Sequence, residues 1–158
     1  MAAYQDSPEL LAVGLKVVKE HHPDLASINI GYLFRDAAPI SRGRITMGVC
    51  VKVDDRNYVY GGKDVIIEVG RDVWDVLDSE LREVLIDHEL NHVGVELDEK
   101  GNPVLTNNSR PKVFIKPHDI EEFGVIIDRY GDTHKRFRKA VEALQVSVDA
   151  TKASPKGE

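Results

Sequence analysis

The sequence has almost no cysteine and no long apolar run, and both absences restrict the kind of protein it encodes. Cys50 is the single cysteine, so no disulfide can form within the chain. No segment approaches the roughly 20 apolar residues that a membrane-spanning helix needs. The first residues also lack the basic start and apolar run of a secretion signal. We therefore expect a cytoplasmic protein with no membrane partner, in which Cys50 packs as a small apolar side chain.

The sequence also has fewer basic than acidic residues. The chain has 21 lysine and arginine residues against 27 aspartate and glutamate residues, which gives a net charge of −6. This balance repels a phosphate backbone, so nucleic acid is not an expected partner. The one basic cluster, residues 134–139, is expected to be a solvated helix face with His134 at the surface, and a nucleic-acid contact there is the minor alternative.

The residues that are present fit one domain. At 158 residues, 42% of them hydrophobic, the chain can bury about 70% of its unfolded surface around a single core. We expect this domain to span residues 1–149. The small and polar residues 150–158 should form a disordered tail. The sequence leaves the oligomeric state open.

Apolar spacing predicts an α+β fold. Ser7 and Pro8 start a predicted helix that ends near residue 20, which leaves His21 and His22 at a helix end rather than on a metal. Alternating apolar residues predict strands at 28–34, 45–53 and 65–69, the first two paired antiparallel. The remaining predicted segments are helices at 72–77, 79–93, 118–130 and 133–146, and extended stretches at 95–97, 104–106 and 112–116. We thus predict a small, mostly antiparallel sheet that packs on the helix at 79–93 and on further helices.

The helix predicted at 79–93 carries the motif His-Glu-x-x-His, formed by His88, Glu89 and His92. Residues four apart lie on nearly the same face of an α-helix, so both imidazoles can reach one metal ion, for which zinc is favoured. Glu89 projects beside them and could take a proton from a metal-bound water that attacks a carbonyl group. A glutamate beside the metal and an open coordination position are typical of catalytic zinc sites. The motif therefore predicts a hydrolase.

Catalytic zinc sites usually have three protein ligands, so a third ligand is expected downstream. In a longer version of the motif, the third histidine comes at a position that here holds Asp98. We favour His118, which starts a predicted helix that could fold back across the motif. Glu122 lies one helical turn beyond His118, so it could replace this ligand or orient an imidazole.

The sequence gives only weak candidates for the group that stabilises the negative oxygen formed during hydrolysis. These candidates are Tyr130 and Tyr60. Asp87 and Asn91 flank the predicted ligands, but helical geometry directs them to other faces, so we expect no catalytic role for them.

The sequence resembles the phage metallopeptidases, small single-domain proteins encoded by bacteriophages and prophages. The resemblance rests on residues 85–92, 110–112, 118–123 and 129–131. It implies a zincin-like α+β fold in the cytoplasm of a bacterial host, and the site residues that it implies are His88, His92 and His118 as ligands and Glu89 as general base. A more distant similarity connects the motif to the SprT-like metalloproteases, but the paired cysteines of a zinc ribbon are absent.

Two hypotheses of different classes follow. The leading one is a Zn²⁺-dependent metallopeptidase that hydrolyses a peptide or protein substrate with a metal-activated water. The alternative is a catalytically silent, zinc-stabilised binding protein that acts on a host protein. A protease directed to nucleic acid is a third hypothesis, and Lys135, Arg136 and Arg138 are its support.

Overall fold

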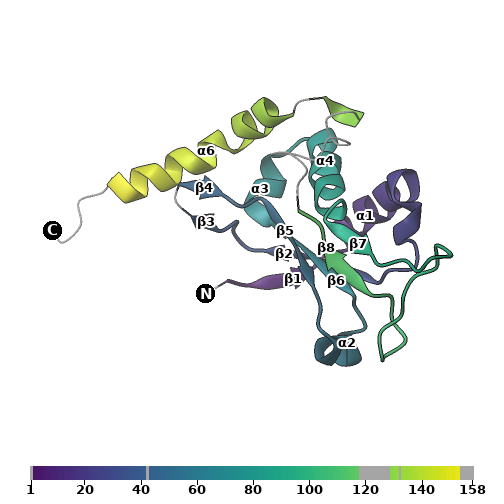
Figure 1. Ribbon diagram of the computed structural model, residues 1–158. Helices are drawn as coiled ribbons and strands as arrows, with labels where there is room; N and C mark the ends of the chain where they lie inside the picture. Colours follow the sequence, from purple (N-terminus) through teal and green to yellow (C-terminus); the bar gives the residue numbers. More distant parts are fainter. Residues whose placement is uncertain (1, 42, 118–128, 132, 154–158) are drawn as a thin grey trace.

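Four strands form the central sheet, and helices pack on one of its faces (Figure 1). The structure, a computed structural model, describes residues 2–41, 43–117, 129–131 and 133–153. In chain order its elements are β1 (Tyr4–Asp6), α1 (Pro8–His21), the 3-10 helix η1 (Pro23–Leu25), β2 (Ile30–Arg35), β3 (Ile40–Ser41), β4 (Arg44–Ile45), β5 (Gly48–Lys52), α2 (Asp55–Gly61), β6 (Val65–Gly70), α3 (Arg71–Val76), α4 (Ser79–Leu90), β7 (Val93–Val95), β8 (Val113–Ile115) and α6 (His134–Ala153).

The strands of the central sheet follow the order β1-β2-β6-β5. β1 pairs antiparallel with β2, β5 pairs antiparallel with β6, and β2 and β6 are parallel. The α+β single domain with a mostly antiparallel sheet is thus confirmed. The predicted direct pairing of the first two long strands is wrong, because β6 lies between them. Val65, Ile67 and Val69 are fully buried, and a strand this apolar takes an inner position of the sheet.

Three short elements have no clear signal in the sequence: β1, the β3–β4 hairpin and α2. All three residues of β1 are exposed, so no apolar alternation marks it, and it becomes a strand only by pairing with β2. α2 buries none of its residues and begins at the N-cap Asp54, whose carboxylate accepts the amide N–H of Asn57. β1 thus depends on strand pairing and α2 on its cap, and neither shows a hydrophobic period.

The C-terminal boundaries also differ from the prediction. α6 continues beyond residue 146 to Ala153, so residues 150–153 of the predicted tail are helical. Residues 154–158 lie outside the described part of the chain. The helix predicted at 118–130 also falls outside it, apart from Arg129 and Tyr130, which are helical.

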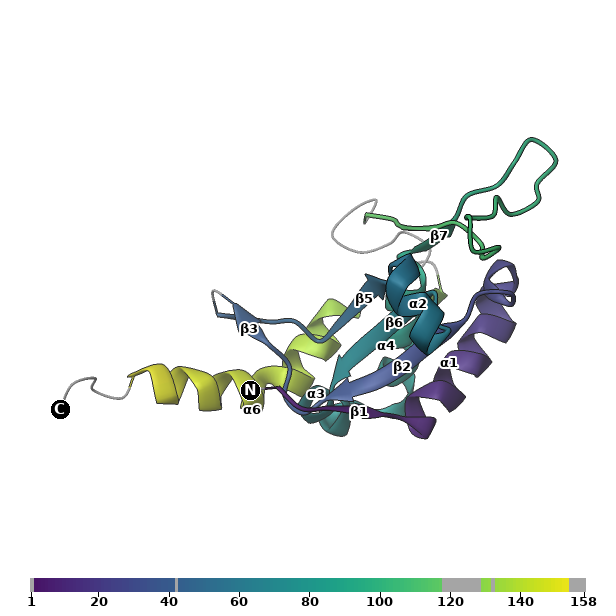
Figure 2. The ribbon, with the colours of Figure 1, turned by 90° about the horizontal axis from the view of Figure 1, so that it is seen from below.

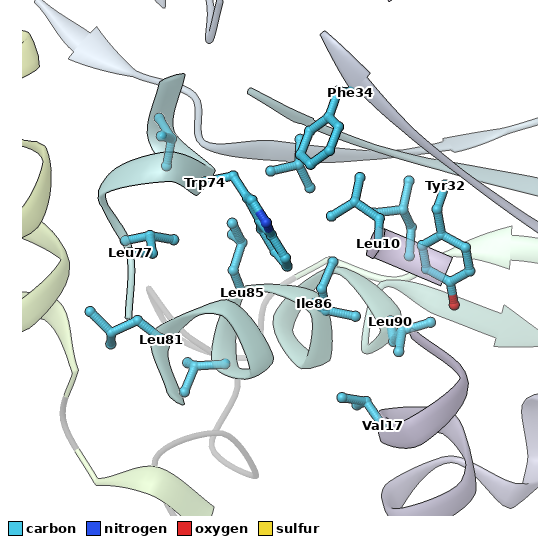
Figure 3. Close-up of a cluster of buried hydrophobic side chains, with 14 of the residues drawn as sticks. Leu10, Val17, Tyr32, Phe34, Trp74, Leu77, Leu81, Leu85, Ile86 and Leu90 are labelled. Atoms are coloured by element: carbon cyan, nitrogen blue, oxygen red, sulfur yellow. The ribbon is translucent and has the colours of Figure 1, made fainter. Parts of the chain in front are cut away.

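The core lies between the sheet and the helices α1, α3 and α4. Trp74 of α3 lies between Phe34 of β2 and Leu85 of α4 (Figure 3). The rings of Phe34 and Trp74 meet edge to face, with their centroids 5.9 Å apart. Gly14 lets α1 approach β2, because a Cβ there would lie 2.2 Å from Cζ of Tyr32. α1 and α4 therefore pack against each other and against the sheet.

Two parts extend from this body in opposite directions, the C-terminal end of α6 and the loop between β7 and β8 (Figures 1 and 2). We call this loop, residues 96–112, the arm. Its two sides are joined by backbone hydrogen bonds, including those from Val104 to Glu96 and from Lys112 to Val104, both 2.8 Å. Residues 98–102 form the turn at its tip, with Gly101 at a φ of 82°. No helix in the described residues is long and apolar enough to cross a membrane.

Candidate metal centre

α4 carries the first two residues of the motif. The carboxylate of Asp78 accepts the amide N–H of Leu81 at 2.8 Å and so caps the start of this helix. The helix ends at Leu90, earlier than the predicted residue 93. Val93 and Val95 form β7 instead, because these β-branched residues pair with β8.

His92 therefore lies just beyond the helix, yet it stays close to His88. Its backbone N–H bonds to the carbonyl of Glu89 at 3.1 Å, which continues the helix by one tightened turn. The rings of His88 and His92 have their centroids 5.2 Å apart. One ligand atom from each of His88, Glu89 and His92 lies within 4.8 Å of the others. This donor set, two imidazoles and a carboxylate, fits a metal ion such as zinc.

The orientation of His92 is set by the chain segment that follows β8. Nδ1 of His92 lies 2.7 Å from the carbonyl oxygen of Lys116. A carbonyl can only accept, so Nδ1 carries the proton and Nε2 presents its lone pair. The backbone N–H of Lys116 also bonds to the carbonyl of His92 at 2.7 Å. Because Nδ1 is used by this hydrogen bond, Nε2 is the nitrogen of His92 that can coordinate a metal.

Glu89 is 4% exposed and lies against β5. A Cβ at Gly48 would be 3.4 Å from Oε1 of Glu89 and 3.2 Å from the carbonyl of Glu68, so a glycine leaves room for the carboxylate. Cys50 lies on the same strand and is half-buried. Burial, together with the charge of Glu89, raises the pKa of the Cys50 thiol to about 12. Cys50 is therefore a neutral thiol at physiological pH, as expected of a packing residue.

A cavity of about 240 Å³ opens beside this group. His134 of α6 borders it, although the sequence predicts a simple surface position for this histidine. Thr133, directly before α6, borders it too and has no signal in the sequence. Among the residues that the structure describes, the lining consists of Met47, Gly48, Leu85, His88, Glu89, Thr133, His134 and Phe137. β5, α4 and α6, which are distant in the sequence, build one cavity wall.

Asp87 precedes His88 but points away from the cavity. It is fully buried and lies 2.5 Å from Nε2 of His22, the C-cap of α1. Arg129 and the hydroxyl of Tyr130 donate to the same carboxylate. Burial on its own would raise the pKa of Asp87, but the hydrogen bonds from His22, Arg129 and Tyr130 outweigh it and lower this pKa below its ordinary value. Asp87 thus stays charged and ties α4 to α1.

The other predicted site residues fall in different places. His118 and Glu122 lie outside the described residues. The carboxylate of Asp98 accepts the amides of Lys100 and Asn102 in the turn of the arm, and it is not in the group that could hold a metal. Tyr60 is 91% exposed on α2, and neither it nor Tyr130 borders the cavity.

The comparisons with known proteins agree with this geometry. The sequence model of the family described as "putative phage metallopeptidase" matches residues 2–146, a span that contains β1 to β8 and the whole His-Glu-His group. No curated protein and no solved structure matches the chain. Because the family match covers most of its length, the chain belongs to the putative phage metallopeptidase family.

Proposed function

We propose that the protein is a zinc-dependent metallopeptidase that hydrolyses peptide bonds in a peptide or protein substrate. One observation carries the proposal: His88, Glu89 and His92 bring their ligand atoms within 4.8 Å of one another, and two of the three border a cavity. The family of the chain supports the same conclusion. A phage or prophage origin and a bacterial cytoplasm as the site of action are part of the proposal.

His88 and His92 would hold the ion, with His118 as the third ligand. When bound, zinc would polarise the scissile carbonyl and lower the pKa of water from 15.7 to about 7. The carbonyl of Lys116 fixes the tautomer of His92, so that Nε2 can coordinate the metal. His88 lies at the end of a capped helix that the core holds in place.

Glu89 would act as the general base. Its carboxylate is buried at the cavity wall, one residue from His88 and 3.9 Å from that imidazole. In this position it can accept the proton of the attacking water and return it to the leaving amine. Because Gly48 has no side chain, the Glu89 carboxylate has space for this proton transfer.

The edge of the sheet favours an extended peptide as the substrate. The backbone N–H of Gly70 donates to the carbonyl of Met47, and the N–H of Val53 donates to the carbonyl of Asp64. In the register of β5 and β6, the backbone groups of every second residue from Met47 to Val53 therefore face β6. The alternation of an antiparallel ladder then directs the N–H and C=O groups of Gly48 and Cys50 to the outer edge of β5, with which no strand of the described residues pairs. A peptide strand could pair with these groups next to Glu89, and such pairing depends little on side chains.

Replacement of Glu89 by glutamine tests the proposal. Glu89→Gln should keep the fold and the zinc, while cleavage of fluorescein-labelled casein or of a mixed peptide library falls by about 10²- to 10⁴-fold, because the base is lost. Glu83→Gln, on the same helix and paired with Lys16 at the surface, is the matched control and should cleave normally. Turnover by Glu89→Gln at the wild-type rate would remove Glu89 from the mechanism. A wild type that carries zinc and cleaves nothing would favour the silent binding protein.

The third ligand is tested by metal content, measured by mass spectrometry on protein purified without added zinc. We expect about one zinc per chain in the wild type, as a metallopeptidase site requires. Asp98→Ala should retain this zinc, and His118→Ala should lose it or hold it more weakly. Equal zinc in all three proteins would exclude His118 as a ligand.

A further inference from the structure

The cavity beside the metal centre has an apolar wall that the proposed chemistry does not use. That chemistry is assigned to His88 and Glu89, which border the cavity. Met47, Leu85 and Phe137 border it as well, and none of these three side chains is ionisable. Apolar side chains next to a reacting bond act on a substrate by binding an apolar part of it. The wall therefore concerns which substrate is bound rather than how it is cleaved.

Core packing holds this wall in place. Leu85 and Phe137 are 3% and 8% exposed and belong to the hydrophobic core. Met47, directly before β5, is half-buried and packs against the same core. Leu85 precedes His88 by three residues, so helical geometry puts both side chains on the same face of α4. The apolar wall thus has a fixed position relative to the imidazole of His88.

The volume of the cavity indicates the size of the side chain that it can take. The cavity measures about 240 Å³. A cavity of roughly 150 Å³ is large enough for a benzene molecule. The side chain of phenylalanine, leucine or methionine therefore fits, whereas glycine or alanine would leave most of the volume to water. An acidic side chain would lose its hydration against the apolar wall, and the carboxylate of Glu89 has the same charge.

The proposed pairing of the substrate with β5 limits how many substrate positions the cavity can select. A Cβ at Gly48 would point toward Glu89, so this is the side of β5 on which the cavity lies. Side chains of a strand alternate between the two sides of a sheet. Of the two residues that flank the cleaved bond, one therefore points toward the cavity and the other points away from it.

We propose that Met47, Leu85 and Phe137 form a specificity pocket for one large apolar side chain, on a single residue next to the cleaved bond. This inference rests on the proposed peptidase function and narrows its substrate class. The preferred substrates are peptide or protein segments with phenylalanine, leucine or methionine at that position. Aspartate and glutamate at the same position are rejected.

A binding measurement tests the pocket without turnover. The probes are blocked phosphinic dipeptides, in which a phosphinate that can bind zinc replaces the cleaved amide. The first has glycine on both sides of the phosphinate, the second has phenylalanine before it, and the third has phenylalanine after it. Calorimetry on zinc-loaded protein should show that one phenylalanine probe binds about 10- to 100-fold more tightly than the glycine probe, because apolar surface is buried. The other phenylalanine probe should bind about as the glycine probe does.

Met47→Lys should change the side chain that the pocket prefers. The stem of lysine can follow the course of the methionine, and its ammonium group brings a positive charge to the cavity. The preferred phenylalanine probe should then bind about tenfold more weakly, and a probe with glutamate at the same position about tenfold more tightly. Met47→Leu keeps the wall apolar and should retain the wild-type preference. Val59→Lys, the same change at a 67% exposed residue of α2, is the matched control.

Equal affinities of the wild type for the three probes would overturn the pocket. Tighter binding of a lysine probe than of the phenylalanine probe would also overturn it, because the charge of Glu89 would then decide the selection. An unchanged preference in Met47→Lys would contradict the wall as described.

Cleavage of a mixed peptide library separates the pocket from the proposed function. The wild type should cleave next to phenylalanine, leucine and methionine about 100-fold more efficiently than next to glycine, at one of the two flanking positions. Cleavage with no such preference at either position would overturn the pocket and leave the peptidase function standing. A wild type that selects the phenylalanine probe but cleaves no peptide would contradict the proposed function and leave the pocket standing.

Discussion

Asp87 contacts side chains from three parts of the chain, although it lies beside a predicted metal ligand. His22, Asn91, Arg129 and Tyr130 all place a polar atom within 3.0 Å of its carboxylate. Replacement by alanine removes the shared acceptor and leaves a buried cluster of donors without a partner. We expect Asp87→Ala to lower the free energy of unfolding by about 3 kcal/mol, measured by urea denaturation.

Asp75→Ala is the control for this prediction. Asp75 forms an exposed pair with Arg71 at 3.8 Å, so its loss should cost no more than about 0.5 kcal/mol. If the two variants unfold at the same urea concentration, the buried network contributes nothing beyond a surface pair.

Cys50 gives a prediction for pH. Its pKa of about 12 means that roughly one thiol in 10,000 is ionised at pH 8, and only the thiolate reacts with iodoacetamide. We expect alkylation of the metal-free protein at pH 8 to be at least about 100-fold slower than in urea, where the pKa returns to about 8.5. Glu89→Gln removes a negative charge near the thiol, so it should lower the pKa of Cys50 and speed its alkylation. Equally fast alkylation in the folded and unfolded states would contradict the burial of this thiol.

At the scale of single residues, the sequence predicts what depends on local spacing. His88, Glu89 and His92 converge as the motif requires, even though the helix stops before His92. Gly48 and Thr133 have no local signature, because their places in the cavity arise only when β5 and α6 meet α4. A residue that reaches the site only through contacts between distant parts of the sequence cannot be identified from sequence spacing alone.

At the scale of elements, the contact between α1 and β2 depends on Gly14. Alanine is favoured over glycine inside a helix by about 1 kcal/mol, but a Cβ at Gly14 would lie 2.2 Å from the Tyr32 ring. We expect Gly14→Ala to destabilise the protein by about 1–3 kcal/mol, because α1 must move away from the sheet. Thermal unfolding measures the change.

Gly61 offers the matched substitution. It lies at the end of α2 with nothing within 4 Å of an added Cβ, so Gly61→Ala should be neutral or stabilising by up to about 1 kcal/mol. A loss of stability in Gly61→Ala equal to that in Gly14→Ala would show that steric contact with Tyr32 is not the cause.

Elements with caps and apolar faces are the ones that the sequence predicts well. Ser7 begins α1 by accepting the amide of Leu10, and Asp78 begins α4 in the same way. The end of α4 is harder to predict, because helix and strand compete over residues 91–95 and pairing with β8 decides the outcome. Sheet order is harder still, since hydrophobic alternation marks β2, β5 and β6 without showing which of them lies between the other two.

At the scale of the whole molecule, Arg110 fastens the arm to the sheet. Its guanidinium is 2% exposed and lies 2.9 Å from the buried carboxylate of Asp64, a charge contact rather than an aligned hydrogen bond. It also donates to the carbonyl of Val53 at 2.9 Å and lies over the ring of Tyr58. The arm is thus held by one side chain that touches β5, α2 and the start of β6.

We expect Arg110→Ala to release the arm while the metal centre stays formed. Amide hydrogen exchange in residues 96–112 should rise, because local opening no longer has to break this buried contact. Zinc content should stay at the wild-type value, since His88 and His92 do not touch Arg110. Lys112→Ala, which removes an exposed pair with Glu96, should leave exchange almost unchanged. Unchanged amide exchange in Arg110→Ala would mean that the backbone hydrogen bonds of the arm keep it ordered without Arg110.

The bond between His92 and Lys116 has a consequence for protein synthesis. The histidine leaves the ribosome first, and 24 more residues must be translated before the carbonyl that fixes its tautomer exists. β8 and its pairing with β7 are also needed to bring the two together. A nascent chain therefore has the motif well before it has an ordered metal site. If the protein is a peptidase, its activity begins only after most of the chain has been made, and the ribosome that makes it carries no active protease.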